Sequence, residues 1–183
     1  MATHKSPQNS LSEVKTIWSI GHSTHSLEDV LAMLHSFEIE LLADIRSYPG
    51  SRRVPQFNKE ALSISLPKNN IRYVHFKDLG GRRKANPDSK NIAWRNSAFR
   101  GYADYMETPG FQVAIKDLEA IARQYRTAYM CSEALWWRCH RSMVSDYLKV
   151  QGWHVIHITG IGKCEEHSLT SPAKVIHGKL QYH

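Results

Sequence analysis

The stretch Thr108–Glu133, TPGFQVAIKDLEAIARQYRTAYMCSE, holds a helix and the strand that follows it. Thr108 is a suitable N-cap, and Pro109 stands at the first helical position, where proline is favoured. Apolar residues then recur at helical spacing and form one stripe as far as Tyr125. The apolar run TAYMC comes next. It predicts a strand whose carboxyl end turns polar at Glu133.

Strands and helices alternate in the same way along the rest of the chain. Hydrophobic periodicity predicts strands over residues 16–23, 39–46, 70–76, 127–133 and 153–160. It predicts helices over residues 27–37, 59–66, 97–108, 109–125 and 139–152, with a capping box formed by Ser26 and Asp29 before the first. This alternation indicates an α/β fold with a single domain, a mainly parallel five-stranded sheet and helices on both faces. We expect a flexible N-terminal tail over residues 1–15, the α/β domain over 16–160 and an irregular C-terminal tail over 161–183.

Composition limits the class of protein. The chain has 183 residues, a length typical of one domain, and its three cysteines do not read as a disulfide framework. The N-terminal stretch is polar, and no apolar run approaches the roughly 20 residues of a membrane span. We therefore expect a cytoplasmic protein that does not engage a membrane. The net charge of +7 suits an anionic small molecule or a nucleic acid as partner, and it suits simple solubility equally well.

Polar side chains gather at the carboxyl ends of the predicted strands. Parallel sheets bind ligands at this edge, so the pattern predicts one shared site there. The residues concerned include His22, Asp44, Arg46, Cys131 and Glu133. The alternative is that chains simply become polar where they leave a core.

The stretch Cys131–Met143, CSEALWWRCHRSM, is the densest part of this pattern. Cys139 precedes an apolar helical stripe, so we place it at a helix N-terminus beside Arg138 and Arg141. That setting predicts a lowered pKa and a reactive thiol, whereas Cys131 reads as a buried strand residue. The alternative for Cys139 is a packing residue. The spacing Cys131-x7-Cys139-His140 lacks the close pairs of structural zinc sites, so the sequence predicts no metal.

Several of these motifs together resemble the family called domain of unknown function 488. They are SIGHS, DIRSYPGSRRVPQF, LGG, YMETPGF and CSE…CHR…HI, in this order, and they cover about Thr16 to Thr159. The resemblance implies a single α/β domain of bacterial or archaeal type and no established activity. It implies site positions at Gly21, His22, Ser23, Asp44, Arg46, Ser51, Arg52, Phe57, Cys131, Glu133, Cys139, His140 and Arg141. The stretch ALWW departs from the family, which more usually has a proline there, so the loop around Trp136 and Trp137 is expected to differ.

Two functional hypotheses follow. In the first, the protein is an enzyme for a phosphate-bearing or nucleotide-like substrate. Its catalytic residues are Cys139, Glu133, Asp44 and His22, and its substrate-binding residues are Arg46, Ser51, Arg52, Phe57, His140 and Arg141. In the second, the arginines bind nucleic-acid phosphates and the tryptophans stack on bases. A confined pocket favours the first, and an open basic groove with exposed aromatic faces favours the second. Neither a cofactor nor an oligomeric state follows from the sequence.

Overall fold

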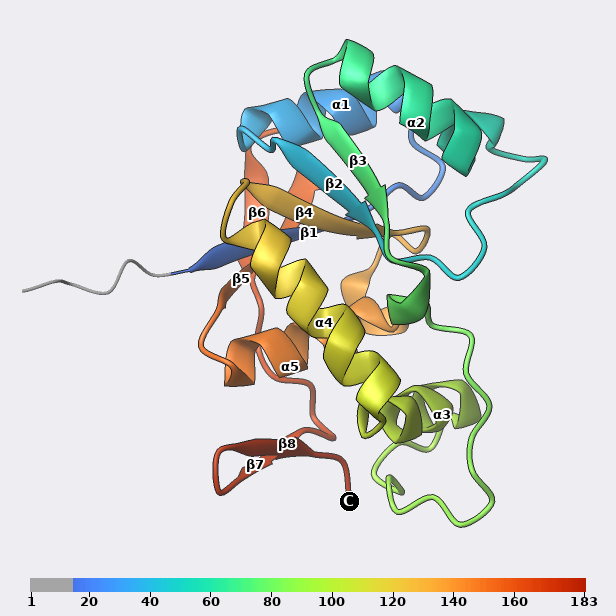
Figure 1. Ribbon diagram of the computed structural model, residues 1–183, viewed down its shortest axis with the longest axis vertical. Coiled ribbons are helices and arrows are strands. Elements are labelled where there is room, and N and C mark those ends of the chain that lie inside the picture. Colours follow the sequence, from blue (N-terminus) through green and yellow to red (C-terminus); the bar gives the residue numbers. More distant parts are fainter. Residues whose placement is uncertain (1–14) are drawn as a thin grey trace, which may run out of the picture.

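The computed structural model describes residues 15–183, so the predicted tail over 1–15 lies outside the described residues except for Lys15. The main sheet has six strands in the order β3-β2-β4-β1-β5-β6 (Figure 1). The strands are β1 (Thr16–Gly21), β2 (Leu41–Asp44), β3 (Arg72–His75), β4 (Thr127–Cys131), β5 (His154–Gly160) and β6 (Lys163–Glu166). The first five pair in parallel, which confirms the predicted α/β class.

Helices cover both faces of this sheet, as predicted. They are α1 (Leu27–Ser36), α2 (Lys59–Lys68), α3 (Ser97–Met106), α4 (Pro109–Ala122) and α5 (Arg141–Val150), with short 3-10 turns η1 (Pro55–Phe57), η2 (Lys77–Leu79) and η3 (Trp136–Arg138). Figure 1 shows α1 and α2 on one side of the sheet and α4 and α5 on the other. Each side has its own buried core, with Leu34 and Leu62 in one, and Phe111 and Val144 in the other.

Local signals set most helix starts. The Ser26 hydroxyl accepts from the Asp29 amide, and the Asp29 carboxylate accepts from the Ser26 amide, which completes the capping box. The Thr108 hydroxyl caps α4 by accepting from the amide of Phe111. The predicted stop of α2 before Pro67 is wrong, because the helix continues to Lys68. A proline this close to a helix end disturbs few backbone hydrogen bonds, so the last turn tolerates it.

The C-terminal segment 161–183 is not irregular, and the sheet has a sixth strand. β6 pairs antiparallel with β5 across a turn in which Gly162 has a φ of +63°. All residues of β6 are exposed, so it lacks the apolar alternation that reveals a strand. A separate hairpin joins β7 (Lys174–Ile176) to β8 (Lys179–Gln181). His177 and Gly178, which connect its strands, both have positive φ, a geometry usually signalled by Asn-Gly.

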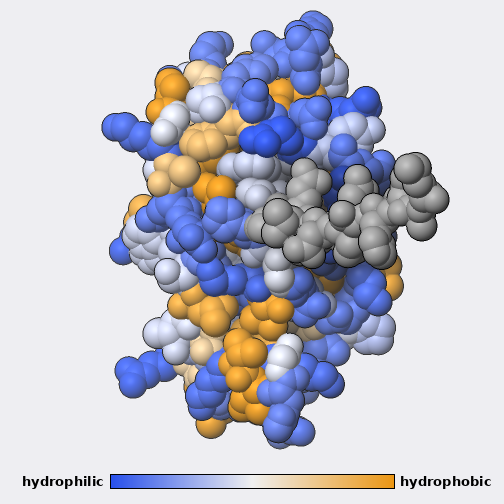
Figure 2. All heavy atoms as spheres, turned by 90° about the vertical axis from the view of Figure 1, so that its left-hand side faces the viewer, coloured by the Kyte–Doolittle hydropathy of each residue, from blue (hydrophilic) through white to orange (hydrophobic). Residues whose placement is uncertain are grey.

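The molecular surface is mostly hydrophilic on the side that carries α5 and the hairpin. Figure 2 shows hydrophobic side chains gathered towards the lower end of this face. Val175 and Ile176 of β7 are among the exposed hydrophobic residues of the protein.

In the part of the chain that the structure describes, no helix is both long enough and apolar enough to span a membrane.

Candidate functional site

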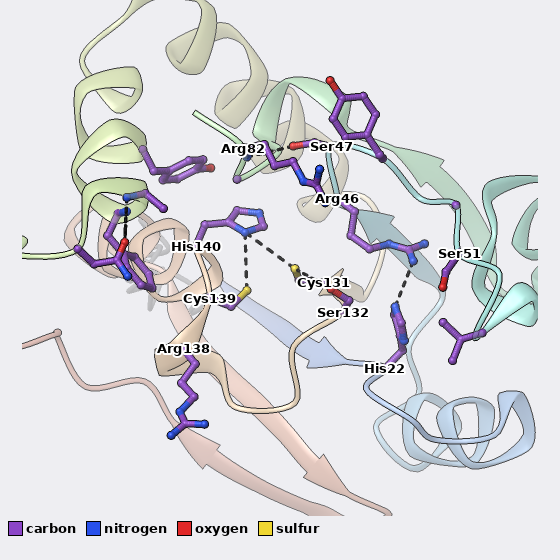
Figure 3. A pocket seen from close by; sticks show the side chains of 18 residues that line it. His22, Arg46, Ser47, Ser51, Arg82, Cys131, Ser132, Arg138, Cys139 and His140 are labelled. Carbon is purple, nitrogen blue, oxygen red and sulfur yellow. Dashed lines mark hydrogen bonds between the residues drawn. The ribbon is translucent and has the colours of Figure 1, made fainter. Parts of the chain in front are cut away.

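A pocket of about 490 Å³ opens at the carboxyl ends of β1, β2 and β4 (Figure 3). His22 enters it from the end of β1, Arg46 from the end of β2, and Cys131 from the end of β4. Cys139 and His140, which precede α5, complete the same wall. The pocket therefore lies at the edge where the sequence predicted a site.

Arg46 is fixed at the pocket wall by a buried carboxylate. Its Nε and Nη2 atoms donate to the two oxygens of Asp44 over 2.8 and 2.6 Å, and Nη2 also donates to the carbonyl oxygen of Phe57. Asp44 is fully buried and also accepts from the Tyr73 hydroxyl. Burial and this neighbouring carboxylate raise the pKa of Tyr73. Asp44 lies behind Arg46 and does not line the pocket, so it orients the arginine.

His22 is held as a neutral ring beside Arg46. Its Nδ1 atom lies 3.0 Å from the carbonyl oxygen of Ser23 and must donate there, so Nε2 accepts from Nη1 of Arg46 over 3.1 Å. The ring also stacks on buried Phe57, with centroids 4.3 Å apart. Burial, and then the charge of Arg46, lower the pKa of His22. Both ring nitrogens are occupied, so the contacts of His22 suit positioning of Arg46.

The two predicted cysteines and His140 form one cluster. Nδ1 of His140 lies 3.9 Å from the sulfur of Cys131 and 3.7 Å from that of Cys139 (Figure 3). A hydrogen bond from the Cys139 thiol lowers the pKa of Cys131 well below its usual value, and the nearby His140 adds to this. Burial, and then the Cys131 sulfur, raise the pKa of Cys139. The sequence argument predicted the lowered pKa for Cys139 from its place before the helix and did not take the burial of its thiol into account.

Arg141 supports the wall of the site from behind. It is 1 % exposed, and its Nη2 donates to the carbonyl oxygens of Glu133 and Ala134. Its Nη1 lies 3.5 Å from the hydroxyl of Ser19. These contacts hold the loop after β4 in place, and Arg141 does not line the pocket. The Glu133 side chain is exposed, and Glu133 lies outside the pocket wall as well.

Of the remaining predicted residues, some line the pocket and others lie outside it. Ser51 lines the pocket, Phe57 is buried behind His22, and Arg52 is exposed outside the wall. The two tryptophans lie outside it too. Trp136 stacks on His157 at 4.4 Å and donates to the Glu165 carboxylate, whereas Trp137 is 50 % exposed.

Sequence reasoning missed several lining residues. Arg82 and Arg138 line the pocket, as do Tyr48, Phe99 and Tyr102, and Figure 3 shows the Arg138 side chain extending away from Cys139 and His140. The first turn of α3 also faces the pocket, where Asn96 caps the amides of Ala98 and Phe99. Nothing in the sequence of α3 distinguishes this turn from an ordinary helix start.

A second polar network lies entirely inside the protein. The Ser19 hydroxyl contacts Nδ1 of His157 at 2.6 Å, Nε2 of His157 contacts Nδ1 of His167 at 2.9 Å, and Nε2 of His167 contacts the Asp146 carboxylate at 2.9 Å. Burial, followed by the charges of His167 and Arg141, lowers the pKa of His157 to about 2. His157 does not line the pocket. Its contacts with Trp136, Ser19 and His167 place it in this buried network, which joins β5 to α5.

Comparison with known proteins gives one match. Residues 26–148 match the family model described as domain of unknown function DUF488, a shorter span than Thr16 to Thr159 because the first and last predicted strands lie outside it. No curated protein matches the chain, and no solved structure matches it either. The family match covers more than half of the sequence and includes Arg46, Cys131, Cys139 and His140. The protein therefore belongs to the family described as domain of unknown function DUF488.

Proposed function

We propose that the protein is an enzyme that acts on a small phosphate-bearing, nucleotide-like substrate bound in the pocket at the strand carboxyl ends. One observation carries this proposal. Arg46, Arg82 and Arg138 line the pocket, and among its lining residues in the described chain there is no aspartate or glutamate. Asp44 offsets the charge of Arg46 from behind the wall, so the attraction for an anion comes mainly from Arg82 and Arg138.

Other features of the wall fit the same class of ligand. The first turn of α3 lies at the wall and brings the positive end of a helix dipole there, which favours a negatively charged group, although Asn96 already caps the amides of Ala98 and Phe99. Tyr48, which is 69 % exposed, and Phe99 offer aromatic faces to a base. A volume of about 490 Å³ lies within the usual range for small-molecule sites.

The reacting end of the substrate is assigned to the cluster of Cys131, Cys139 and His140. These three residues supply the two thiols of the wall and, together with His22, its imidazoles, and the ring nitrogens of His22 are already occupied. Asp44 and Glu133 do not line the pocket, so their proposed part is limited to orienting Arg46 and to the loop after β4.

The nucleic-acid hypothesis remains the second candidate, because Trp137 is half exposed and the protein carries a net charge of +7. Trp136 already stacks on His157 and donates a hydrogen bond to Glu165, so it is not available to stack on a nucleic-acid base. The small-ligand hypothesis is therefore preferred.

Mass spectrometry of small molecules released from the denatured full-length protein tests the proposal. A phosphate-bearing compound is expected, and it should bind again to the emptied protein in isothermal titration calorimetry at low salt. Failure of inorganic phosphate and of a panel of nucleoside mono-, di- and triphosphates to bind at low salt would overturn the proposal.

A further inference from the structure

The fold brings three metal-binding side chains to one point. Cys131 ends β4, and Cys139 and His140 stand immediately before α5. The sulfur atoms and Nδ1 of His140 all lie within 4.8 Å of one another. In the sequence the two cysteines are separated by seven residues, a spacing that argued against a metal site. The turn η3 folds this intervening loop back, so the spacing no longer separates the donor atoms.

His140 has the tautomer that a metal ligand needs. Its Nε2 atom lies 3.0 Å from the carbonyl oxygen of Ile45. A carbonyl oxygen can only accept, so Nε2 carries the hydrogen, and Nδ1 presents a lone pair towards the two sulfurs (Figure 3). Metal-binding histidines usually hold their second nitrogen in this way, with a backbone carbonyl as partner.

The space around Nδ1 is also kept free. A Cβ atom on Gly81 would lie 2.4 Å from Nδ1 of His140, so any larger residue there would cover the nitrogen. Tyr102 packs edge-on against the same ring, with centroids 5.1 Å apart, and fixes its orientation. The lone pair therefore faces the sulfurs in a ring that is restrained on several sides.

The distances match tetrahedral coordination by zinc. With Zn–S near about 2.3 Å and Zn–N near about 2.0 Å, neighbouring sulfur and nitrogen ligands stand about 3.6 Å apart. The two sulfur–nitrogen separations of 3.7 and 3.9 Å are close to this value, and all three donor atoms lie within 4.8 Å of one another, so side-chain adjustments would complete the geometry. Two thiolates and an imidazole favour zinc over calcium and magnesium, which prefer oxygen ligands.

We propose that Cys131, Cys139 and Nδ1 of His140 bind one Zn²⁺ ion whose fourth coordination position opens into the pocket. All three residues line that pocket, so the side without a protein ligand faces the cavity. Two cysteines and one histidine with an open position are the pattern of a catalytic zinc, whereas structural sites have four protein ligands. Binding releases the two thiol protons to solvent, and the two thiolates balance the charge of the ion.

The inference concerns whether Cys131, Cys139 and His140 bind zinc, and it does not depend on the identity of the proposed substrate. The test measures zinc in the full-length protein, purified without chelator, by inductively coupled plasma mass spectrometry. About one zinc per chain is expected in the wild type and in Cys164→Ser, whose cysteine is exposed on β6. Cys131→Ser, Cys139→Ser and His140→Ala should each lower the zinc content at least about tenfold.

A second measurement covers variants that fail to fold. The wild type, stripped of metal and titrated with Co²⁺, should show a thiolate-to-cobalt charge-transfer band, as should Cys164→Ser. The inference would be overturned if folded wild-type protein contained no zinc, gave no charge-transfer band with Co²⁺, and formed a Cys131–Cys139 disulfide on mild oxidation. Full zinc content in folded Cys131→Ser would overturn it as well. Phosphate binding by the metal-free protein is measured separately, so the metal site and the anion site can fail independently.

Discussion

The Nε2 atom of His140 donates a hydrogen bond to the carbonyl oxygen of Ile45 over 3.0 Å. This bond connects the residue before α5 with the residue that follows β2. It sets the ring so that Nδ1 faces both cysteine sulfurs. The cluster of Cys131, Cys139 and His140 is thereby held in a fixed position relative to Arg46, since Arg46 directly follows Ile45.

Gly21→Ala should destabilise the protein strongly. The new Cβ would lie 1.9 Å from the carbonyl oxygen of Glu133 and 2.8 Å from Nη2 of Arg141, so the loop after β4 would have to move. Overpacking of this kind costs about 1–3 kcal/mol or more, which urea denaturation would detect as a lower midpoint. Gly50→Ala is the matched control, because a Cβ at Gly50 meets nothing within 4 Å. Equal midpoints for the two variants would contradict the close packing at Gly21.

Arg82→Gln should weaken binding of the phosphate-bearing ligand by about tenfold or more. A hydrogen bond to a charged group contributes about 1.5–3 kcal/mol, and glutamine removes the positive charge from the wall. Lys68→Gln is the control, since it removes the same charge at the end of α2, away from the pocket. Isothermal titration calorimetry would compare the two variants. A similar loss of binding affinity in both variants would show that the effect comes from net charge, and that Arg82 does not contact the ligand.

Salt dependence separates the two functional hypotheses. A small ligand with one or two phosphates should bind with a shallow dependence on salt, because few charges are neutralised. A single-stranded nucleic acid that contacts several phosphates should show a log–log slope of about −0.7 for each of them. Fluorescence anisotropy with a short labelled oligonucleotide would measure this between low and moderate salt. No binding at low salt would exclude the nucleic-acid candidate, and a steep slope would favour it over the small ligand.

Stability should decrease as the pH falls below about 6.5. Folded His157 has a pKa of about 2, whereas the unfolded chain takes up this proton near 6.5. Below that pH the unfolded state binds more protons, so the stabilising contribution is complete above about 6.5 and declines as the pH is lowered. His157 alone accounts for about 1 kcal/mol between about pH 6.5 and about pH 5.5. Urea denaturation across this range would measure it.

Two variants test the assignment of this dependence. His157→Gln should flatten the pH dependence, because its side chain does not titrate. His35→Gln replaces an exposed histidine on α1 and should leave the dependence as in the wild type. An unchanged slope in His157→Gln would show that another group is responsible.

Much of the fold is readable in the sequence. The capping box at Ser26, Thr108 with Pro109, and the apolar strand runs act locally, so periodicity and turn chemistry identify them. The sequence did not predict β6, because its residues are exposed on both faces and show no apolar alternation. It did not predict the β7–β8 hairpin, because His177 takes a positive φ that no sequence rule signals. These elements depend on pairing partners, which a local pattern does not contain.

The site is only partly readable for the same reason. Strand-end placement pointed to His22, Arg46 and Cys131, since a parallel sheet brings such ends together. Sequence position could not distinguish Arg46, which lines the cavity, from Arg141, which is buried against backbone carbonyl groups. Arg82 and Asn96 reach the pocket from loops whose path depends on tertiary packing. The depth of burial, which reverses the expected pKa of Cys139, is likewise a property of the assembled fold.

The carboxylate of Asp146 determines where the protein can be shortened. It lies fully buried in α5, and within the described chain each hydrogen bond to its oxygens comes from beyond β5: from His167, from the amide and hydroxyl of Thr170, and from the hydroxyl of Tyr182. A fragment cut at residue 148, where the family match ends, would retain this charge without a donor. The same cut removes β5, which pairs with β1 in the main sheet, so the fragment would lose sheet pairing together with these hydrogen bonds. Expression of an independently folding fragment therefore requires the chain as far as Tyr182.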